Sequence, residues 1–254
     1  MKLYRTIVLP DIHTPRHHEP SLKAILPFIK DFKPDRLVQL GDFCDWDCMS
    51  KHSMYNVDEF IEMSDEVKAA NLMLDRLEKV LPPKCEKIML GGNHEDRYHQ
   101  AKAAHMFVPD KISKSMAQWK DSWAHEYDLD KRGWKWTEYG EIVEFGKLVF
   151  THGWFAAKTS GDMRSTADQA PGKNIICGHN HKHHVYGCMD EKGLPIESES
   201  IGTLSRFDLS YLRGRRATDW VHGFMFIYTK KDGKFNKYFT HVIDGEFIAN
   251  GKVY

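Results

Sequence analysis

The sequence lacks a long apolar run and a leader-like N-terminus. No apolar stretch approaches the roughly 18 residues of a membrane span. The first residues reach Asp11 and His13 too soon to contain the apolar core of a signal peptide. We therefore expect a soluble, unexported, cytoplasmic protein that makes no membrane contact.

The chain also carries no formal net charge and has few cysteines. The 36 Lys and Arg residues balance 36 Asp and Glu residues in 254, which excludes a strongly basic polyanion binder. Five cysteines are sparse and odd in number, so a disulfide framework is disfavoured and a reducing compartment favoured. Cys44 and Cys48 lack a second pair at zinc-ribbon spacing, so we predict small buried thiols rather than a thiolate metal site.

Apolar material is sufficient for a sizeable core, at 41% hydrophobic and 12% aromatic residues. In the first half, short apolar runs ending at Leu9, Leu40 and Leu90 alternate with stretches of helical spacing. After Trp134 strand-like alternation dominates, and Lys231-Asp232-Gly233 predicts a hairpin turn. The predicted helices cover about 20–32, 56–81 and 95–105.

This order of elements predicts a layered α/β (α+β) fold. We expect a four-layer αββα sandwich, in which two stacked mixed sheets are flanked by helices. The sequence contains no internal repeat, low-complexity tract or Pro/Ser-rich linker, so residues 1–254 are expected to form a single domain. The stretch 102–130, rich in Lys, Trp and Met, is the candidate for an inserted cap.

Five polar clusters follow the predicted strand ends. Strand ends in open α/β sheets converge on one crevice, so these residues are expected to share a site. His, Asp and Asn without Cys form a mixed nitrogen and oxygen donor set, which suits Mn, Fe, Zn or Ni. A carboxylate such as that of Asp42 could bridge two ions. The clusters are Asp11-x-His13, Gly41-Asp42-x-x-Asp45, Gly92-Asn93-His94-Glu95, His152-Gly153 and Gly178-His179-x-His181.

In order and composition, these clusters resemble the pattern of calcineurin-like metallophosphoesterases. That pattern is D-x-H, G-D-x-x-D, G-N-H-[DE], H and G-H-x-H, and the resemblance spans residues 11–181. It implies a phosphoester hydrolase with two divalent metal ions, manganese favoured among Mn, Fe, Zn and Ni, and a bridging hydroxide as the nucleophile.

The resemblance also implies a role for each matching residue. His94 matches the histidine that donates a proton to the leaving oxygen, and Asp45 matches the acid that orients it. Asp42 would bridge the two ions. One ion would be held by Asp11, His13, Asp42 and His181, and the other by Asp42, Asn93, His152 and His179.

The chain departs from the protein phosphatase branch at Trp46, where that branch has an arginine for the substrate phosphate. Arg97 and Asn93 are the candidates to contact phosphate here, because a guanidinium can hold two phosphate oxygens in a fork. Arg97 is equally consistent with a surface ion pair. His183 and His184 have no counterpart in the family pattern, and we expect them to be solvated. His17 and His18 follow a motif loop and are expected at the surface, with a contact to phosphate at the rim as the alternative.

We therefore predict a metal-dependent phosphodiesterase whose partner is a phosphoester substrate, with a nucleotide or nucleic acid as the candidate. The missing arginine at Trp46 and the basic segment Arg213–Arg216 favour diesters, although a solvated loop also explains that segment. The alternatives are a phosphomonoesterase or protein phosphatase, and a non-catalytic scaffold with the same fold. The natural substrate and the oligomeric state stay open.

Overall fold

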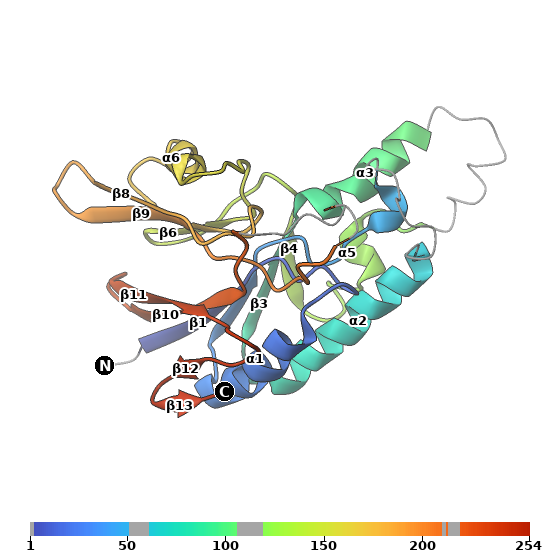
Figure 1. The fold of residues 1–254 in the computed structure, drawn as a ribbon, viewed down its shortest axis with the longest axis horizontal. Coiled ribbons are helices and arrows are strands. Elements are labelled where there is room, and N and C mark those ends of the chain that lie inside the picture. The colour runs from blue at the N-terminus through green and yellow to red at the C-terminus, as the bar shows by residue number, and fades with distance from the viewer. Residues whose placement is uncertain (1–2, 51–60, 106–118, 210–211, 213–218) are drawn as a thin grey trace.

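The computed structural model describes residues 3–50, 61–105, 119–209, 212 and 219–254. Two mixed β-sheets lie face to face, with α1 and α2 below the larger sheet and α6 above the smaller one (Figure 1). The predicted four-layer α/β architecture is therefore confirmed. The helices are α1 (Glu19–Phe32), α2 (Met63–Val80), α3 (Asn93–His105), α5 (Trp123–Glu126) and α6 (Gly161–Ala167), with a 3-10 turn η1 (Asp47–Met49).

The larger sheet has the strand order β11-β10-β1-β2-β3-β4. The neighbours β1, β2, β3 and β4 run parallel, whereas β10 pairs antiparallel with both β1 and β11. The predicted turn at 231–233 joins β10 to β11. The strands are β1 (Leu3–Leu9), β2 (Arg36–Gln39), β3 (Glu86–Leu90), β4 (Trp134–Thr137), β10 (Gly223–Lys230) and β11 (Phe235–His241).

The smaller sheet has the order β5-β6-β7-β9-β8, in which β6, β7 and β9 are parallel. Helix α6 packs on β7, β8 and β9. A separate strand pair, β12 and β13, lies near the C-terminus (Figure 1). The bounds are β5 (Val143–Phe145), β6 (Leu148–Thr151), β7 (Asn174–Cys177), β8 (Val185–Met189), β9 (Pro195–Ser200), β12 (Ile248–Ala249) and β13 (Lys252–Val253).

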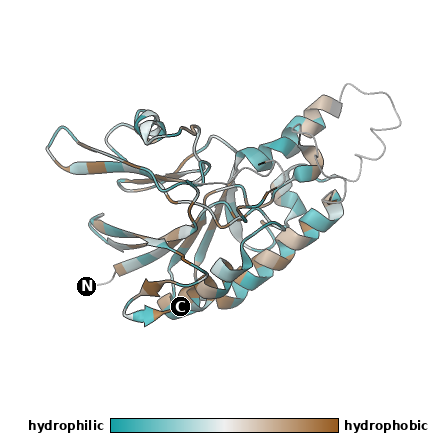
Figure 2. Cartoon of the chain, viewed as in Figure 1, coloured by the Kyte–Doolittle hydropathy of each residue, from teal (hydrophilic) through white to brown (hydrophobic). Residues whose placement is uncertain are grey.

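Strand alternation divides the core into two layers. Ile7 and Leu9 of β1 pack in the cluster that contains the apolar faces of α1 and α2, whereas Val8 between them belongs to the cluster shared with the smaller sheet. Successive strand residues point to opposite faces, which explains this split. Apolar and polar residues alternate along α1 and α2, as expected for helices with one buried face (Figure 2).

All three predicted helices are observed, but α3 begins at Asn93 rather than at 95, and the short helices α5 and α6 were not predicted. Helix α2 begins at Met63 rather than at 56, because Glu62 has extended backbone dihedrals; residues 56–60 lie outside the described part of the chain. No described helix is both long and apolar enough to cross a bilayer.

The described parts of the predicted cap belong to regular or buried structure. Residues 102–105 end α3. Trp123, Tyr127 and Leu129 pack in the core cluster that contains the apolar faces of α1 and α2. Residues 106–118 lie outside the described part of the chain.

Candidate metal centre

Polar side chains gather where the parallel strands of both sheets end. The ends of β1, β2 and β3 contribute from the larger sheet, and those of β6 and β7 from the smaller. His13 and His181 come from opposite sheets, yet their Nε2 atoms lie 3.1 Å apart. All seven residues assigned to metal binding from the sequence lie at these ends: Asp11, His13, Asp42, Asn93, His152, His179 and His181.

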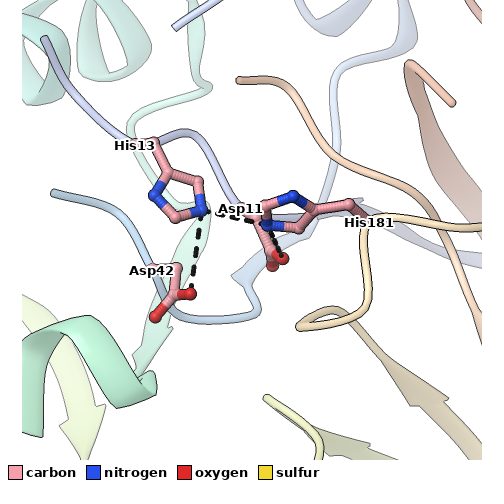
Figure 3. A group of neighbouring side chains, drawn as sticks. All are labelled: Asp11, His13, Asp42 and His181. Atoms are coloured by element: carbon pink, nitrogen blue, oxygen red, sulfur yellow. Dashed lines mark hydrogen bonds and ion pairs between the residues drawn. The ribbon is translucent and has the colours of Figure 1, made fainter. Parts of the chain in front are cut away.

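The first cluster consists of Asp11, His13, Asp42 and His181 (Figure 3). One potential ligand atom from each lies within 4.8 Å of the others. His181 Nε2 is 3.1 Å from Asp11 Oδ2, and His13 Nε2 is 3.7 Å from Asp42 Oδ2. The structure thus brings together the four residues assigned to one ion, and their action as ligands stays a prediction.

The second cluster contains Asp42, His152 and His179, whose ligand atoms also lie within 4.8 Å of one another. Asn93 completes it, because its Oδ1 accepts from His152 Nε2 at 2.9 Å and from His179 Nδ1 at 2.8 Å. These are the residues assigned to the other ion. Asp42 belongs to both clusters, and its role as a bridging ligand stays a prediction.

The surroundings of these donors fit divalent cations. Asp11 Oδ1 is buried and accepts no hydrogen bond within the described residues, although a buried carboxylate oxygen is costly without a partner. A Cβ atom at Gly178 would lie 2.1 Å from that oxygen, and one at Gly92 would lie 2.2 Å from Asp42 Oδ1. Only glycine leaves room at these two positions. No side chain at residue 92 or 178 therefore crowds the two carboxylates.

The electrostatics of the centre favour positive charge. Burial alone would raise the pKa of Asp42, but the neighbouring His152 and His94 hold it well below its usual value. Burial likewise opposes charge on His13, yet hydrogen bonding and attraction to Asp45 raise the pKa of His13 to about 9. Cations would replace these protons, since histidine binds a metal in its neutral form.

Four of the predicted ligands have left-handed backbone conformations. Such residues cost on the order of 1–3 kcal/mol each and persist only where the surroundings hold them. Here the loops hold one another: His13 N–H donates to the Asp42 carbonyl at 2.9 Å, and His179 N–H donates to Asp11 Oδ2 at 2.8 Å. The φ angles are 53° at His13, 48° at Asp42, 73° at His179 and 61° at His181.

His94 and Asp45 lie beside the two clusters. His94 N–H donates to Asp42 Oδ1 at 2.9 Å, and His94 Nδ1 lies 3.1 Å from Asp45 Oδ1. Asp45 also accepts from His13 Nδ1 at 3.0 Å, and these contacts hold its pKa below the usual range against the effect of burial. Asp45 therefore orients a predicted ligand as well as the predicted proton donor.

Arg97 contacts His94 directly. Its guanidinium donates to the Asp45 carbonyl at 2.9 Å and lies 3.0 Å from His94 Nε2. His94 Nδ1 is 2.6 Å from the same carbonyl, which can only accept. His94 therefore carries its proton on Nδ1 in this arrangement, and Nε2 accepts from Arg97. A second contact, 3.9 Å to Asp47, keeps the ion-pair alternative open.

Trp46 packs among buried aromatic residues. Its side chain is fully buried, stacked on Tyr127 and edge-on to Tyr98. Trp46 is thus a core residue rather than a pocket residue. Cys44 is buried and Cys48 is half-buried; both are free thiols, and burial raises the pKa of each.

Two charged residues that support the site received no role from the sequence. Glu95 is fully buried and accepts backbone hydrogen bonds from Asp42, Phe43, Cys44 and Gly92 at 2.8–3.1 Å. Glu95 is the last residue of the G-N-H-[DE] cluster, so the family pattern already marked this position. Arg16, 3.1 Å from Asp45 Oδ2, follows the D-x-H cluster by three residues and showed no pattern of its own.

The extra histidines His17, His18, His183 and His184 are half-buried at the surface, and their rings contact neighbouring side chains. His183 stacks on Phe239 and lies 2.9 Å from Glu199, while His184 lies 3.1 Å from buried Asp162. His18 stacks on His222 with ring centroids 3.9 Å apart. These contacts join residues far apart in the sequence, so local polarity does not reveal them. The basic residues 213–216 lie outside the described residues.

Comparison with known proteins gave three findings. A sequence model described as calcineurin-like phosphoesterase matches residues 4–209. The chain is 27% identical over 262 residues to the Gene 54 protein of Mycobacterium phage D29 and 26% identical over 266 residues to that of phage L5, with 98% of each chain covered. It is similar to the structure of vacuolar protein sorting 29 from Cryptosporidium parvum, with a TM-score of 0.49, 12% identity and coverage of 100% and 96% of the two chains. A dimetal phosphatase from Danio rerio gives a TM-score of 0.43, 11% identity and coverage of 93% and 98%.

Proposed function

Because the chain belongs to the calcineurin-like phosphoesterase family and is therefore a metal-dependent phosphoester hydrolase, we propose that it cleaves phosphodiesters of nucleotides or nucleic acids at a centre of two divalent ions. The observation that carries this proposal is the sharing of Asp42 between two adjoining ligand clusters. Manganese is the favoured metal because carboxylate and amide oxygens suit it, whereas the imidazole nitrogens suit iron, zinc and nickel as alternatives.

The residues of the first and second clusters would hold the ions. Divalent ions bound there would supply Lewis acidity toward the phosphoryl group and lower the pKa of a bound water. The buried carboxylates and imidazoles keep the donor atoms oriented, because each loop is fixed by hydrogen bonds from another. His152 Nε2 lies 3.4 Å from Asp42 Oδ2 and 2.9 Å from Asn93 Oδ1, which connects the second cluster to Asp42.

His94 would protonate the leaving oxygen from Nε2, after that nitrogen takes up a proton in place of the hydrogen bond from Arg97. It lies at the rim of the centre, 3.8 Å from Asp42 Oδ2 through Nε2, and is 8% exposed. A proton donor must reach the substrate from within the pocket, and this position meets that condition. Asp45 would support the charged form of His94 through its carboxylate, 3.1 Å from Nδ1.

Arg97 would contact the substrate phosphate together with Asn93. A guanidinium has five N–H donors, and the contacts of Arg97 with the Asp45 carbonyl and His94 engage two of its nitrogens. Donors therefore remain for a phosphate oxygen next to the proton donor. The preference for diesters rests on the burial of Trp46 in the core, where the protein phosphatase branch has an arginine.

A substrate comparison tests the function. The purified chain, loaded in turn with Mn, Fe(II), Zn and Ni, is offered bis(p-nitrophenyl) phosphate and p-nitrophenyl phosphate, then cyclic nucleotides, single- and double-stranded DNA and phosphopeptides. We expect faster turnover of diesters and of nucleotide substrates. Faster monoester turnover with every metal would establish the phosphomonoesterase alternative. Failure to bind metal or to turn over any substrate would favour the scaffold alternative.

A further inference from the structure

A second concave site adjoins the metal centre. It is a groove of about 570 Å³ beside the carboxyl end of β1, in the size range of small-molecule sites. We call it the aromatic groove and define it by six of its lining residues: His18, Phe207, Trp220, His222, Ile243 and Asp244.

Three rings form a continuous stack along this groove. His222 lies between His18 and Phe207, with centroids 3.9 Å apart on both sides and interplanar angles of 9° and 19°. The segments that carry them are far apart in the sequence, so the stack exists only in the folded chain. A parallel stack offers flat surfaces on which a further planar group can continue the series.

Trp220 lies between the groove, which it lines, and the candidate metal centre, where it contacts His181. Its ring lies edge-on to His181, a predicted ligand, with centroids 4.2 Å apart. The next residue, Val221, donates its N–H to the His181 carbonyl at 3.0 Å. A molecule whose phosphate lies at the centre could therefore extend past Trp220 into the groove.

The wall of the groove is neutral at its aromatic stack. Burial lowers the pKa of His222 to about 4 and also lowers that of His18, so both rings are uncharged near neutral pH. Among the described residues that line the groove, Asp244 supplies the one carboxylate. This composition repels a second phosphate, accepts a flat uncharged ring and can accept hydrogen bonds from ring amino groups.

We propose that the aromatic groove binds the base of a nucleotide whose phosphate lies at the metal centre. This inference rests on the proposed function and names the part of the substrate that sets its specificity. Stacking accommodates any base, because every base has a π-face. The groove therefore distinguishes nucleotides from phosphoesters that carry no ring, rather than one base from another.

A pair of ligands that differ only in the base tests the proposal. Adenosine 5′-monophosphate and ribose 5-phosphate are titrated by calorimetry into the manganese-loaded full chain. We expect the nucleotide to bind about 5- to 100-fold more tightly, the range that stacking on aromatic side chains gives. Phe207→Ala should bring the ratio of the two dissociation constants close to 1.

A variant at an exposed residue tests whether misfolding could explain the effect of Phe207→Ala. Ile243 is 67% exposed, so Ile243→Ser should leave the fold intact while lowering the ratio about threefold through lost apolar contact. Ile248, 74% exposed and outside the groove, provides the matched control Ile248→Ser, which should leave the ratio unchanged.

The outcomes separate this inference from the proposed function. Equal binding of the two ligands by the wild-type chain, or equal ratios in wild type and both groove variants, would overturn the base site even if diesters are hydrolysed. An equal effect of Ile248→Ser would also overturn it. Tight binding of the nucleotide that the groove variants abolish, in a chain without turnover, would support the base site and refute the diesterase.

Discussion

Asp42 lies where the two clusters of candidate ligands meet. Its carboxylate approaches His13 and His152 at 3.7 and 3.4 Å and accepts from the backbone of His94. Its burial is nearly complete, at 2% exposure. A single side chain thus connects both clusters to the predicted proton donor, and the strongest single-residue effects are expected here.

We expect Asp42→Asn to lose both metal and activity. The amide keeps the size of the side chain but removes the charge that a bridging ligand supplies, so bound manganese should fall and turnover should drop by about 10³-fold or more. Elemental analysis after gel filtration and a diester assay measure the two effects. Asp47→Asn, a nearby acid outside both clusters, should retain metal; equal metal content in the two variants would contradict the bridging role.

His94→Ala should separate chemistry from metal binding. Loss of the general acid should slow hydrolysis of esters with alkyl leaving groups by about 10²–10⁴-fold, with a smaller effect on p-nitrophenyl esters, whose leaving group needs no proton. Metal content should not change. His99→Ala, on the same helix but paired with Glu138, serves as control. Equal rates of wild type and His94→Ala on an alkyl ester would remove the assignment.

At the scale of elements, the start of α3 holds the loop after β2. Glu95 in the first turn of α3 accepts from four backbone N–H groups, three of them in the segment 42–44. This arrangement fixes the left-handed Asp42, whose conformation is otherwise unfavourable. A helix start, rather than a sheet contact, therefore positions the shared ligand.

Glu95→Gln should destabilise the fold and weaken metal binding together. An amide leaves two of the four N–H groups without an acceptor, so the free energy of unfolding should fall by about 2–6 kcal/mol, at about 1–3 per group. Guanidinium denaturation and manganese titration measure both quantities. Asp96→Asn changes the adjacent acid, whose side chain bonds Gln100, and should have little effect; a similar loss in both variants would show that charge on α3, not the loop contact, matters.

Helix α2 carries a buried acid whose titration should affect stability. Burial raises the pKa of Glu66 to about 7, from an ordinary value near 4.5. Between these values the unfolded chain ionises Glu66 while the folded chain keeps its proton, so stability falls as pH rises, by up to about 1.4 kcal/mol per pH unit. Denaturation at pH 5, 6 and 7 should show a flatter dependence for Glu66→Gln; parallel curves would contradict the shift.

For the whole molecule, the metal centre connects the two sheets. Loops from β1, β2 and β3 of one sheet contribute ligands together with loops from β6 and β7 of the other. The side chains of Asp11, His13, Asp42, His152 and His181 are buried, and that of His179 is half-buried. Metal binding should therefore stabilise the packing of one sheet on the other and not only the loops.

Metal loading should raise the unfolding temperature. A cation that binds the folded chain at 100 times its dissociation constant adds about 2.7 kcal/mol of stability, apart from any binding to the unfolded chain. Thermal melts in manganese and in chelator measure this difference. Asp42→Asn should abolish most of it. If the wild-type chain melts at the same temperature in manganese and in chelator, the result would argue against a metal site between the sheets.

Much of the fold could be predicted from local patterns. Strand ends at Leu9 and Leu90 and the helix over 20–32 lie within one residue of those observed, because apolar periodicity is a property of neighbouring residues. Sheet order was not predictable in this way. The placement of β10, from the far end of the chain, next to β1 depends on long-range packing that no local segment encodes.

The sequence by itself determined which metal-binding residue types follow which strands. Strand periodicity and the residues after each strand are local features of the sequence. With the family pattern, the sequence also predicted which four histidines meet at the centre. Only the tertiary structure decided where His18, His183 and His222 pack. It also turned Trp46 into the core and brought Arg97 against His94. The physical reason is that side-chain direction and burial follow from how distant loops and layers pack, and that packing exists only once the two sheets are assembled.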